Sequence, residues 1–229
     1  MRFCTMLTVC VVTVTTFLSS PVMADVVLTF DQTGIFDGTP INSSYGDAVT
    51  SASDGVGSYG IVAGAGDLFT PNVNVSYTAG EPRLWTTGYS NLTNVFFDDL
   101  DFNDSFEITF SADPGFEVGI HEFDLGAFGS LTIPGLEILD GDNNVLWSIG
   151  STAIDGTTAS SFSTGGVFAE SLTISADLTG LGGGSDNVGI DNIRFSQRAS
   201  AVPEPASGAC LLLVGVLCTL SRRRSGLSF

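Results

Sequence analysis

The amino-acid sequence predicts an all-β protein whose exported part folds as a single β-sandwich. No segment keeps the 3.6-residue apolar period of an amphipathic helix. Short β-branched and aromatic runs instead alternate with turn residues, among them many of the 28 glycines. Between two apolar chain ends lie about 170 residues, enough for one domain with its own core. We expect neither a second domain nor an internal repeat.

Residues 1–24 have the features of a secretory signal peptide. Arg2 supplies a positive start, Met6–Leu18 is apolar, and Val22-Met23-Ala24 ends in a small-residue cleavage signal. Asp25 is therefore the expected first residue of a protein exported through the Sec translocon, and residues 25–196 are the expected extracytoplasmic domain.

Nine segments within this domain have the composition of strands. In one of them Phe106, Ile108 and Phe110 share a face, while the residues between them are polar, as a half-buried strand requires. Two others flank Asp140–Asn144, which predicts a hairpin. The predicted strands are Val26–Phe30, Val73–Tyr77, Asn94–Phe97, Phe106–Phe110, Phe116–Phe128, Leu136–Leu139, Val145–Ile149, Leu172–Ala176 and Val188–Phe195.

Two of these strands shift the phase of their apolar residues. The shift separates Val118–Ile120 from Phe123–Leu125, and in the last strand it separates Val188–Ile190 from Ile193–Phe195. A strand that keeps its apolar side chains inward across such a shift needs one extra residue, which is a β-bulge. We therefore predict bulges near His121-Glu122 and near Asp191-Asn192.

The C-terminal tail has three parts in a defined order. A linker, residues 197–202, leads to Pro203-Glu204-Pro205, then to an uncharged apolar run, and then to Arg222-Arg223-Arg224. A helix over residues 206–221 would be short for a bilayer of about 30 Å, but arginine side chains can reach the interface. Because arginine clusters stay cytoplasmic, residues 225–229 would be a cytoplasmic tail. The alternative, a buried amphipathic helix, lacks the polar face that it would need.

This order of residues resembles the PEP-CTERM sorting signal of bacterial exported proteins. Pro203, Glu204 and Pro205 match its motif, and Arg222, Arg223 and Arg224 match its terminal cluster. The resemblance implies an exosortase as partner and a transient anchor in the inner membrane. It also implies delivery to the cell surface or exopolysaccharide matrix of a biofilm-forming, Gram-negative-type bacterium.

The segment Gly189–Phe195 resembles the closing strand of galactose-binding-like jelly rolls of the carbohydrate-module type. Phe116–Phe128, Gly141–Trp147, Tyr45–Asp47 and Trp85–Tyr89 are also similar to exported domains of this sort. The resemblance covers most of residues 25–195. It implies a jelly-roll sandwich, sometimes with a structural calcium ion, and it implies no particular ligand.

Composition excludes several classes of function. The four cysteines lie in the two apolar ends, so the exported domain has neither a disulfide nor thiol chemistry. All seven basic residues are arginines, and between residues 25 and 200 three of them face 24 acidic residues, a net charge of −21. Such a domain should repel nucleic acid and anionic lipid. The acidity fits a salt-adapted surface or the attraction of divalent cations.

Calcium is the best-motivated ion because it prefers six to eight oxygen ligands. One candidate site pairs Asp31, at the end of the first strand, with Asp191 in the last strand; the alternative is that Asp31 caps a turn and Asp191 lies in a solvated bulge. Asp140-x-Asp142-x-Asn144 imitates the start of a calcium loop but is better explained as a hairpin turn. The acidic run Asp98–Asp104 is expected to be a solvated loop.

Sugar binding is the sharper alternative to a purely structural or adhesive role. Trp85 and Tyr89 could stack on sugar rings, as could Tyr59, Tyr77 and Trp147, although aromatic residues of a sandwich more often pack in its core.

We expect no enzymatic activity. The single histidine, His121, is accompanied by no Gly-x-Ser-x-Gly elbow. Hydrolysis of glycosides needs only two carboxylates and is the third choice.

Overall fold

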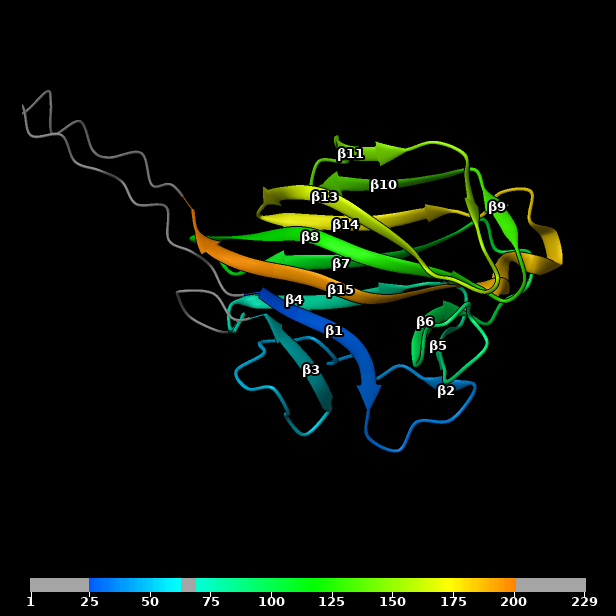
Figure 1. The fold of residues 1–229 in the computed structure, drawn as a ribbon. Helices are drawn as coiled ribbons and strands as arrows, with labels where there is room; N and C mark the ends of the chain where they lie inside the picture. The colour runs from blue at the N-terminus through cyan, green and yellow to red at the C-terminus, as the bar shows by residue number, and fades with distance from the viewer. Residues whose placement is uncertain (1–24, 63–68, 201–229) are drawn as a thin grey trace, which may run out of the picture.

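The computed structural model describes residues 25–62 and 69–200. The signal peptide, the predicted anchor helix and the sorting residues Pro203–Pro205 and Arg222–Arg224 lie outside these ranges. Within the described residues no helix has both the length and the apolar character needed to cross a membrane. The structure is a sandwich of two antiparallel sheets, which confirms the predicted all-β, jelly-roll class (Figure 1).

The larger sheet has the strand order β13-β8-β15-β6-β5-β2, with β1 paired to both β15 and β3. It therefore brings the first strand beside the last one (Figure 1). Its strands are β1 (Asp25–Gln32), β2 (Thr39–Pro40), β3 (Gly57–Val62), β5 (Pro82–Trp85), β6 (Val95–Asp98), β8 (Phe116–Ala127), β13 (Ser160–Ala169) and β15 (Val188–Ala199).

The second sheet has the order β11-β10-β14-β7-β4 and packs against the larger one. A separate pair joins β9 to β12, and a 3₁₀ helix, η1 (Gly182–Asn187), precedes β15. The strands are β4 (Val73–Thr78), β7 (Ser105–Ala112), β9 (Leu131–Ile133), β10 (Gly135–Asp140), β11 (Val145–Ile149), β12 (Thr152–Ile154) and β14 (Ser171–Asp177).

Aromatic side chains fill the space between the two sheets. The rings of Phe110 and Phe195 lie 5.0 Å apart, and those of Phe96 and Phe106 lie 5.6 Å apart, so each pair joins one sheet to the other. The predicted inward face of β7 is confirmed, since Phe106, Ile108 and Phe110 are all fully buried. Alternation along each strand then turns the intervening polar residues outward.

All nine predicted strands are present, and the predicted hairpin at Asp140–Asn144 joins β10 to β11. The Asp140 carboxylate accepts hydrogen bonds from the backbone N–H groups of Asp142 and Asn144, at 2.9 Å each. These bonds hold a turn, as expected, and explain why the residues imitate a calcium loop.

Both predicted bulges are present. Asp191 pairs with Asp124, and Arg194 pairs with Glu122, so β15 holds one residue more than β8 in this interval. The next pair joins Phe195 to Ile120, which leaves His121 as the extra residue of β8. Asn192 has a positive φ of 52°, the left-handed conformation that asparagine tolerates better than most residues.

Two expectations need correction. β15 continues to Ala199, three residues into the predicted linker, because residues 197–199 pair with the first residues of β8. Asp98 is fully buried rather than part of a solvated loop. Its carboxylate accepts hydrogen bonds from the backbone N–H groups of Gly80, Glu81 and Leu100, and these bonds compensate its burial.

Candidate functional site

A polar pocket forms where β15 changes its neighbour. Residues 189 and 190 pair with β6, whereas residues 193–195 pair with β1. Asp191 and Asn192 lie between these two pairings, beside the bulge. β1 bends away at the same level, where Phe30 has a positive φ of 53° and the register with β3 shifts. The sheet is therefore open on this side of Asp191.

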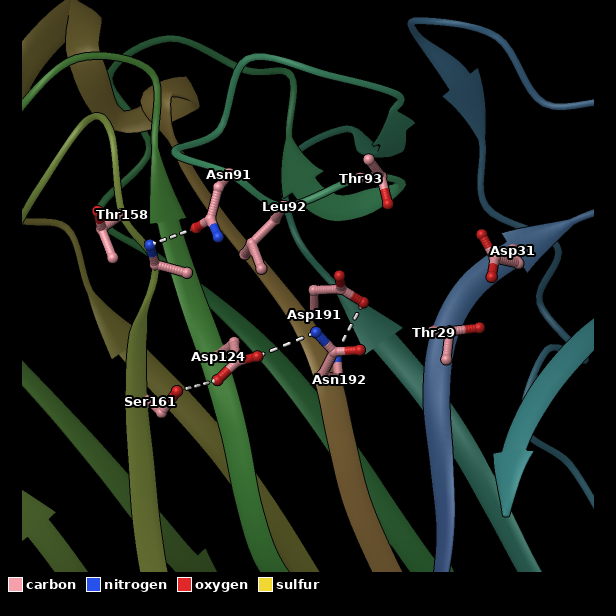
Figure 2. A pocket seen from close by; sticks show the side chains of 11 residues that line it. Thr29, Asp31, Asn91, Leu92, Thr93, Asp124, Thr158, Ser161, Asp191 and Asn192 are labelled. Atoms are coloured by element: carbon pink, nitrogen blue, oxygen red, sulfur yellow. Dashed lines mark hydrogen bonds between the residues drawn. The ribbon is translucent and has the colours of Figure 1, made fainter. Parts of the chain in front are cut away.

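The floor of this pocket is a row of polar side chains across the outer face of the sheet. Ser161 of β13 pairs with Asp124 of β8, which in turn pairs with Asp191. Because Phe123 and Leu125 point into the core, Asp124 points outward. The strand residues that line the pocket are Thr29, Asp31, Asp124, Ser161, Asp191 and Asn192 (Figure 2).

Two loops form the walls, and the pocket has a volume of about 400 Å³. The loop residues that line it are Asn91, Leu92, Thr93, Thr158 and Ala159. Asn91 holds the two loops together, since its side-chain oxygen accepts a hydrogen bond of 2.7 Å from the backbone N–H of Ala159 (Figure 2). Leu92 is the one large apolar side chain among these lining residues.

A pair of glycines lets the first loop approach the sheet. Gly126 and Gly189 are paired across β8 and β15. A Cβ on Gly126 would lie 2.6 Å from the backbone oxygen of Tyr89, and one on Gly189 would lie 2.7 Å from Val95. Any side chain at these two positions would push the loop outward. Gly126 and Gly189, which belong to the segments Phe116–Phe128 and Gly189–Phe195, therefore allow Asn91–Thr93 to lie over Asp191.

Hydrogen bonds fix the floor of the pocket. The Asp124 carboxylate accepts one bond of 2.6 Å from the Ser161 hydroxyl and one of 2.9 Å from the Asn192 amide (Figure 2). Asn192 can reach Asp124 because of its left-handed backbone at the bulge. The bulge therefore orients a polar side chain toward the pocket.

Asp191 is the most unusual group of the pocket. Its side chain is almost completely buried, with 4% of the residue exposed. One carboxylate oxygen accepts a hydrogen bond of 2.6 Å from the backbone N–H of Asn192, whereas the described residues offer the other oxygen no partner. Burial raises the pKa of Asp191 to about 8, and the nearby carboxylates of Asp124 and Asp31 add to this increase.

Asp31 and Asp191, the residues predicted to meet, do line the same pocket (Figure 2). Asp31 is already engaged, since its carboxylate accepts a hydrogen bond from the Asn94 amide. Calcium prefers six to eight oxygen ligands. The described residues contain no group of three or more acidic, histidine or cysteine side chains arranged to hold a metal ion. This donor set fits calcium poorly, and we keep calcium as an alternative occupant.

Trp85 and Tyr89, the predicted sugar-stacking residues, lie in a small apolar cluster beside the pocket. Tyr89 is 4% exposed, and its ring lies 5.6 Å from that of Phe97; the Trp85 ring packs edge-on against Phe97 at 5.8 Å. The Tyr89 hydroxyl donates a hydrogen bond to the backbone oxygen of Asp186. Tyr89 therefore has no free face for a sugar, and it anchors the loop that forms one wall.

The structure also places His121 near a serine and a carboxylate. Its Nε2 atom lies 2.8 Å from the Ser196 hydroxyl and 3.4 Å from the Asp25 carboxylate. A hydrolytic triad needs the two partners on opposite ring nitrogens, whereas here both contact one. Ser196 is also fully buried. Burial lowers the pKa of His121, although Asp25 opposes this effect.

Asp25 joins the first strand to the last. Its carboxylate contacts two guanidinium nitrogens of Arg194, both at 2.5 Å, and Arg194 also contacts Glu122 at 3.3 Å. The predicted first residue of the mature protein is thus held within the sandwich, and this cluster is structural.

Sequence reasoning identified Asp31 and Asp191, and Asn192 as part of the predicted bulge, but missed the other polar residues of the pocket. Asp124 lies in the segment Phe116–Phe128 that carried the family resemblance, and the shift of phase next to it could have identified it. Ser161 and Asn91 carried no signal, because they come from segments in which no strand or motif is evident.

Comparisons with solved structures give partial and distant similarities. A CBM4 structure is 14% identical over 55% of this chain and 87% of its own, with a TM-score of 0.33. A cyclase from Fischerella sp. TAU is 17% identical over 57% of this chain and 76% of its own (TM-score 0.32). TmCBM61, solved with β-1,4-galactotriose, is 16% identical over 56% of this chain and 88% of its own (TM-score 0.27). No protein-family model and no curated protein matches the chain.

Proposed function

We propose that this is an exported protein that adheres to extracellular polysaccharide through the polar pocket. The observation that carries the proposal is the pocket itself, which is open to solvent and lined almost entirely by hydroxyl, amide and carboxylate groups. Sugars present many hydroxyl groups that both donate and accept hydrogen bonds. These side chains provide matching partners.

The size and rigidity of the pocket support binding of a small part of a chain. Its volume of about 400 Å³ falls within the range of small-molecule sites, roughly 300–1,000 Å³. Asp124 is held by two side-chain hydrogen bonds, so its orientation is fixed before a ligand arrives. A site that is already ordered loses less conformational entropy on binding.

We propose binding without turnover. The His121 cluster lacks the geometry of a hydrolytic relay and lies apart from the pocket residues. Incubation of the protein with the polysaccharide that it retains should release no new reducing ends. Sustained release that a pocket variant abolishes would show an enzyme instead.

Binding is best tested with two substitutions on one strand. Ser161 and Ser163 are both exposed and lie two residues apart on β13, so their side chains share a face, but only Ser161 lines the pocket. The variant Ser161→Trp should fill the pocket and abolish retardation of the full-length protein in gels that contain matrix polysaccharide. The variant Ser163→Trp should migrate like the wild type. Equal retardation of both variants would refute the pocket as the site.

Export and sorting form the second part of the proposal. The sequence supports a signal peptide, an exosortase signal at Pro203-Glu204-Pro205 and a cytoplasmic cluster at Arg222–Arg224. In the native bacterium, deletion of the exosortase gene should leave the protein in the inner membrane, and its restoration should deliver the protein to the surface or matrix. Intact protein in the cytosol with Met1 still attached would contradict this part.

A further inference from the structure

We infer that the pocket recognises a sugar that carries a positively charged amino group, so that the preferred polysaccharide contains unacetylated amino sugars. This inference rests on the proposed function and specifies its substrate class.

The charged side chains that line the pocket are all acidic. Asp31 comes from β1, Asp124 from β8 and Asp191 from β15, and the lining residues of the two loops are uncharged. The nearest arginine along β15, Arg194, contacts Asp25 and Glu122 instead. Three carboxylates around one cavity, with no basic residue among those described as lining it, favour a cation over a neutral or anionic ligand.

Asp191 provides an independent indication. Only 4% of the Asp191 residue is exposed, and the carboxylate of so buried a residue normally has a cation or several donors as partners. Here one oxygen has only its neighbour's backbone N–H, and the other projects into the space that Leu92, Thr93 and Asp31 border (Figure 2). A bound ammonium group would donate to this oxygen and replace the hydration that Asp191 has lost. The increase in the pKa of Asp191 has the same origin, namely burial without a cation.

The arrangement of the carboxylates favours an organic cation over a metal ion. No three acidic side chains among the described residues are close enough to hold a metal together. The cavity, about 400 Å³, is also far larger than one ion requires. Hydroxyl and amide groups of Thr29, Asn91 and Ser161 line the remaining space. An amino sugar uses both features, because its ammonium group faces carboxylates while its hydroxyl groups meet polar side chains.

The test compares three disaccharides that differ at one position. The β-1,4-linked disaccharides of glucosamine, N-acetylglucosamine and glucose carry an ammonium, an acetamide and a hydroxyl group at carbon 2. Calorimetry with the full-length protein at about pH 6.5, where amines of this class are protonated, should show the first binding about tenfold or more tightly than the others. Because the ammonium group ionises Asp191, binding should also release about one proton, measured in buffers of different ionisation enthalpy.

Two variants separate the pocket from the acidic surface. Asp191→Asn removes the buried group that can ionise toward the ligand, whereas Asp142→Asn removes one carboxylate from the exposed β10–β11 turn. Asp191→Asn should lose both the preference and the proton release, and Asp142→Asn should keep both. A preference that survives in Asp191→Asn would overturn the inference, since it would show unspecific attraction to a polyacidic protein.

The remaining outcomes separate the inference from the proposed function. Equal binding of all three disaccharides, or tighter binding of an uncharged one, would overturn the inference while polysaccharide binding stands. Binding of calcium alone, abolished by Asp191→Asn, would overturn the inference in favour of a metal site. Absence of binding to all three disaccharides and to matrix polysaccharide would refute the proposed function and the inference together.

Discussion

Replacing Asp191 with asparagine should stabilise the protein, and the gain should grow with pH. In the folded protein the pKa of Asp191 is raised from 3.8 to about 8, with burial as the main cause. The folded state therefore keeps a proton that the unfolded state loses above about pH 4. The contribution of this group to stability is greatest below pH 4 and decreases as the pH rises toward 8. Asparagine, with similar shape and no charge, is free of this dependence.

The magnitude follows from the interval between the two pKa values. Each pH unit within the interval corresponds to about 1.36 kcal/mol. Between pH 5 and pH 7 the stability advantage of Asp191→Asn should therefore grow by up to about 2.7 kcal/mol. The backbone hydrogen bond from Asn192 is retained, because the asparagine side chain still offers an oxygen.

Denaturant unfolding of both proteins at several pH values measures this difference. The buffers must contain neither amines nor divalent cations, since either could occupy the pocket. All other titrating groups are common to the two proteins, so their effects cancel in the difference. A difference that stays constant between pH 5 and pH 7 would show that Asp191 is ionised in the folded protein, and would refute the account of the pocket as a site without a resident cation.

Three further predictions concern the surroundings of the pocket. Arg194→Gln should lower the free energy of unfolding by roughly 2–3 kcal/mol, because it leaves the buried Asp25 carboxylate without its cation. Arg198→Gln should lower it by about 1 kcal/mol or less, because its partner Glu117 is more exposed. Equal losses in denaturant unfolding would contradict this difference. Gly126→Ala should lower the free energy of unfolding by roughly 1–3 kcal/mol and weaken polysaccharide binding, because the new Cβ displaces the loop at Tyr89. Gly150→Ala places its Cβ in open space and should change neither stability nor binding. Exhaustive treatment with a chelator should leave the melting midpoint unchanged, and elemental analysis should find no bound metal; a lower midpoint with bound calcium would restore the Asp31–Asp191 calcium site.

The sequence predicts strands well where apolar residues alternate and poorly where they do not. All nine predicted strands are present, because each contains at least two apolar residues that are buried or pack against an apolar cluster. The long strand β13 was missed, since Ser160–Gly166 holds a single buried apolar side chain, Phe162. β13 is an edge strand, and its pairing with β8 supplies the order that its own composition does not predict.

The bulges were predictable because their cause lies in the sequence. When the apolar residues of a strand shift phase, a β-bulge is the simplest way to keep them all facing the core. Both predicted bulge positions are confirmed within a residue. The walls of the pocket were not predictable in the same way. Asn91 comes from a loop whose approach depends on the glycine pair Gly126–Gly189, and Thr158 comes from a second loop that a hydrogen bond joins to Asn91. Both contacts join segments far apart in the chain.

The sugar-stacking role of Trp85, which is half-buried, stays a prediction, whereas the burial of Tyr89 shows a further limit of sequence reasoning. Composition cannot separate an aromatic ring on the surface from one that packs a loop against the sheet. Here the outward-facing Phe97 forms a second apolar cluster with Tyr89, and the pocket next to it depends on polar groups.

The central claim, that polysaccharide is bound at the polar pocket, is tested most directly by NMR. Backbone amide signals of the isotope-labelled full-length protein would be followed while a fragment of the matrix polysaccharide is added. The account predicts that the largest shifts cluster at Asn91, Asp124 and Asn192. Shifts concentrated elsewhere, for example along the exposed edge of β11, with those three signals unchanged, would contradict it.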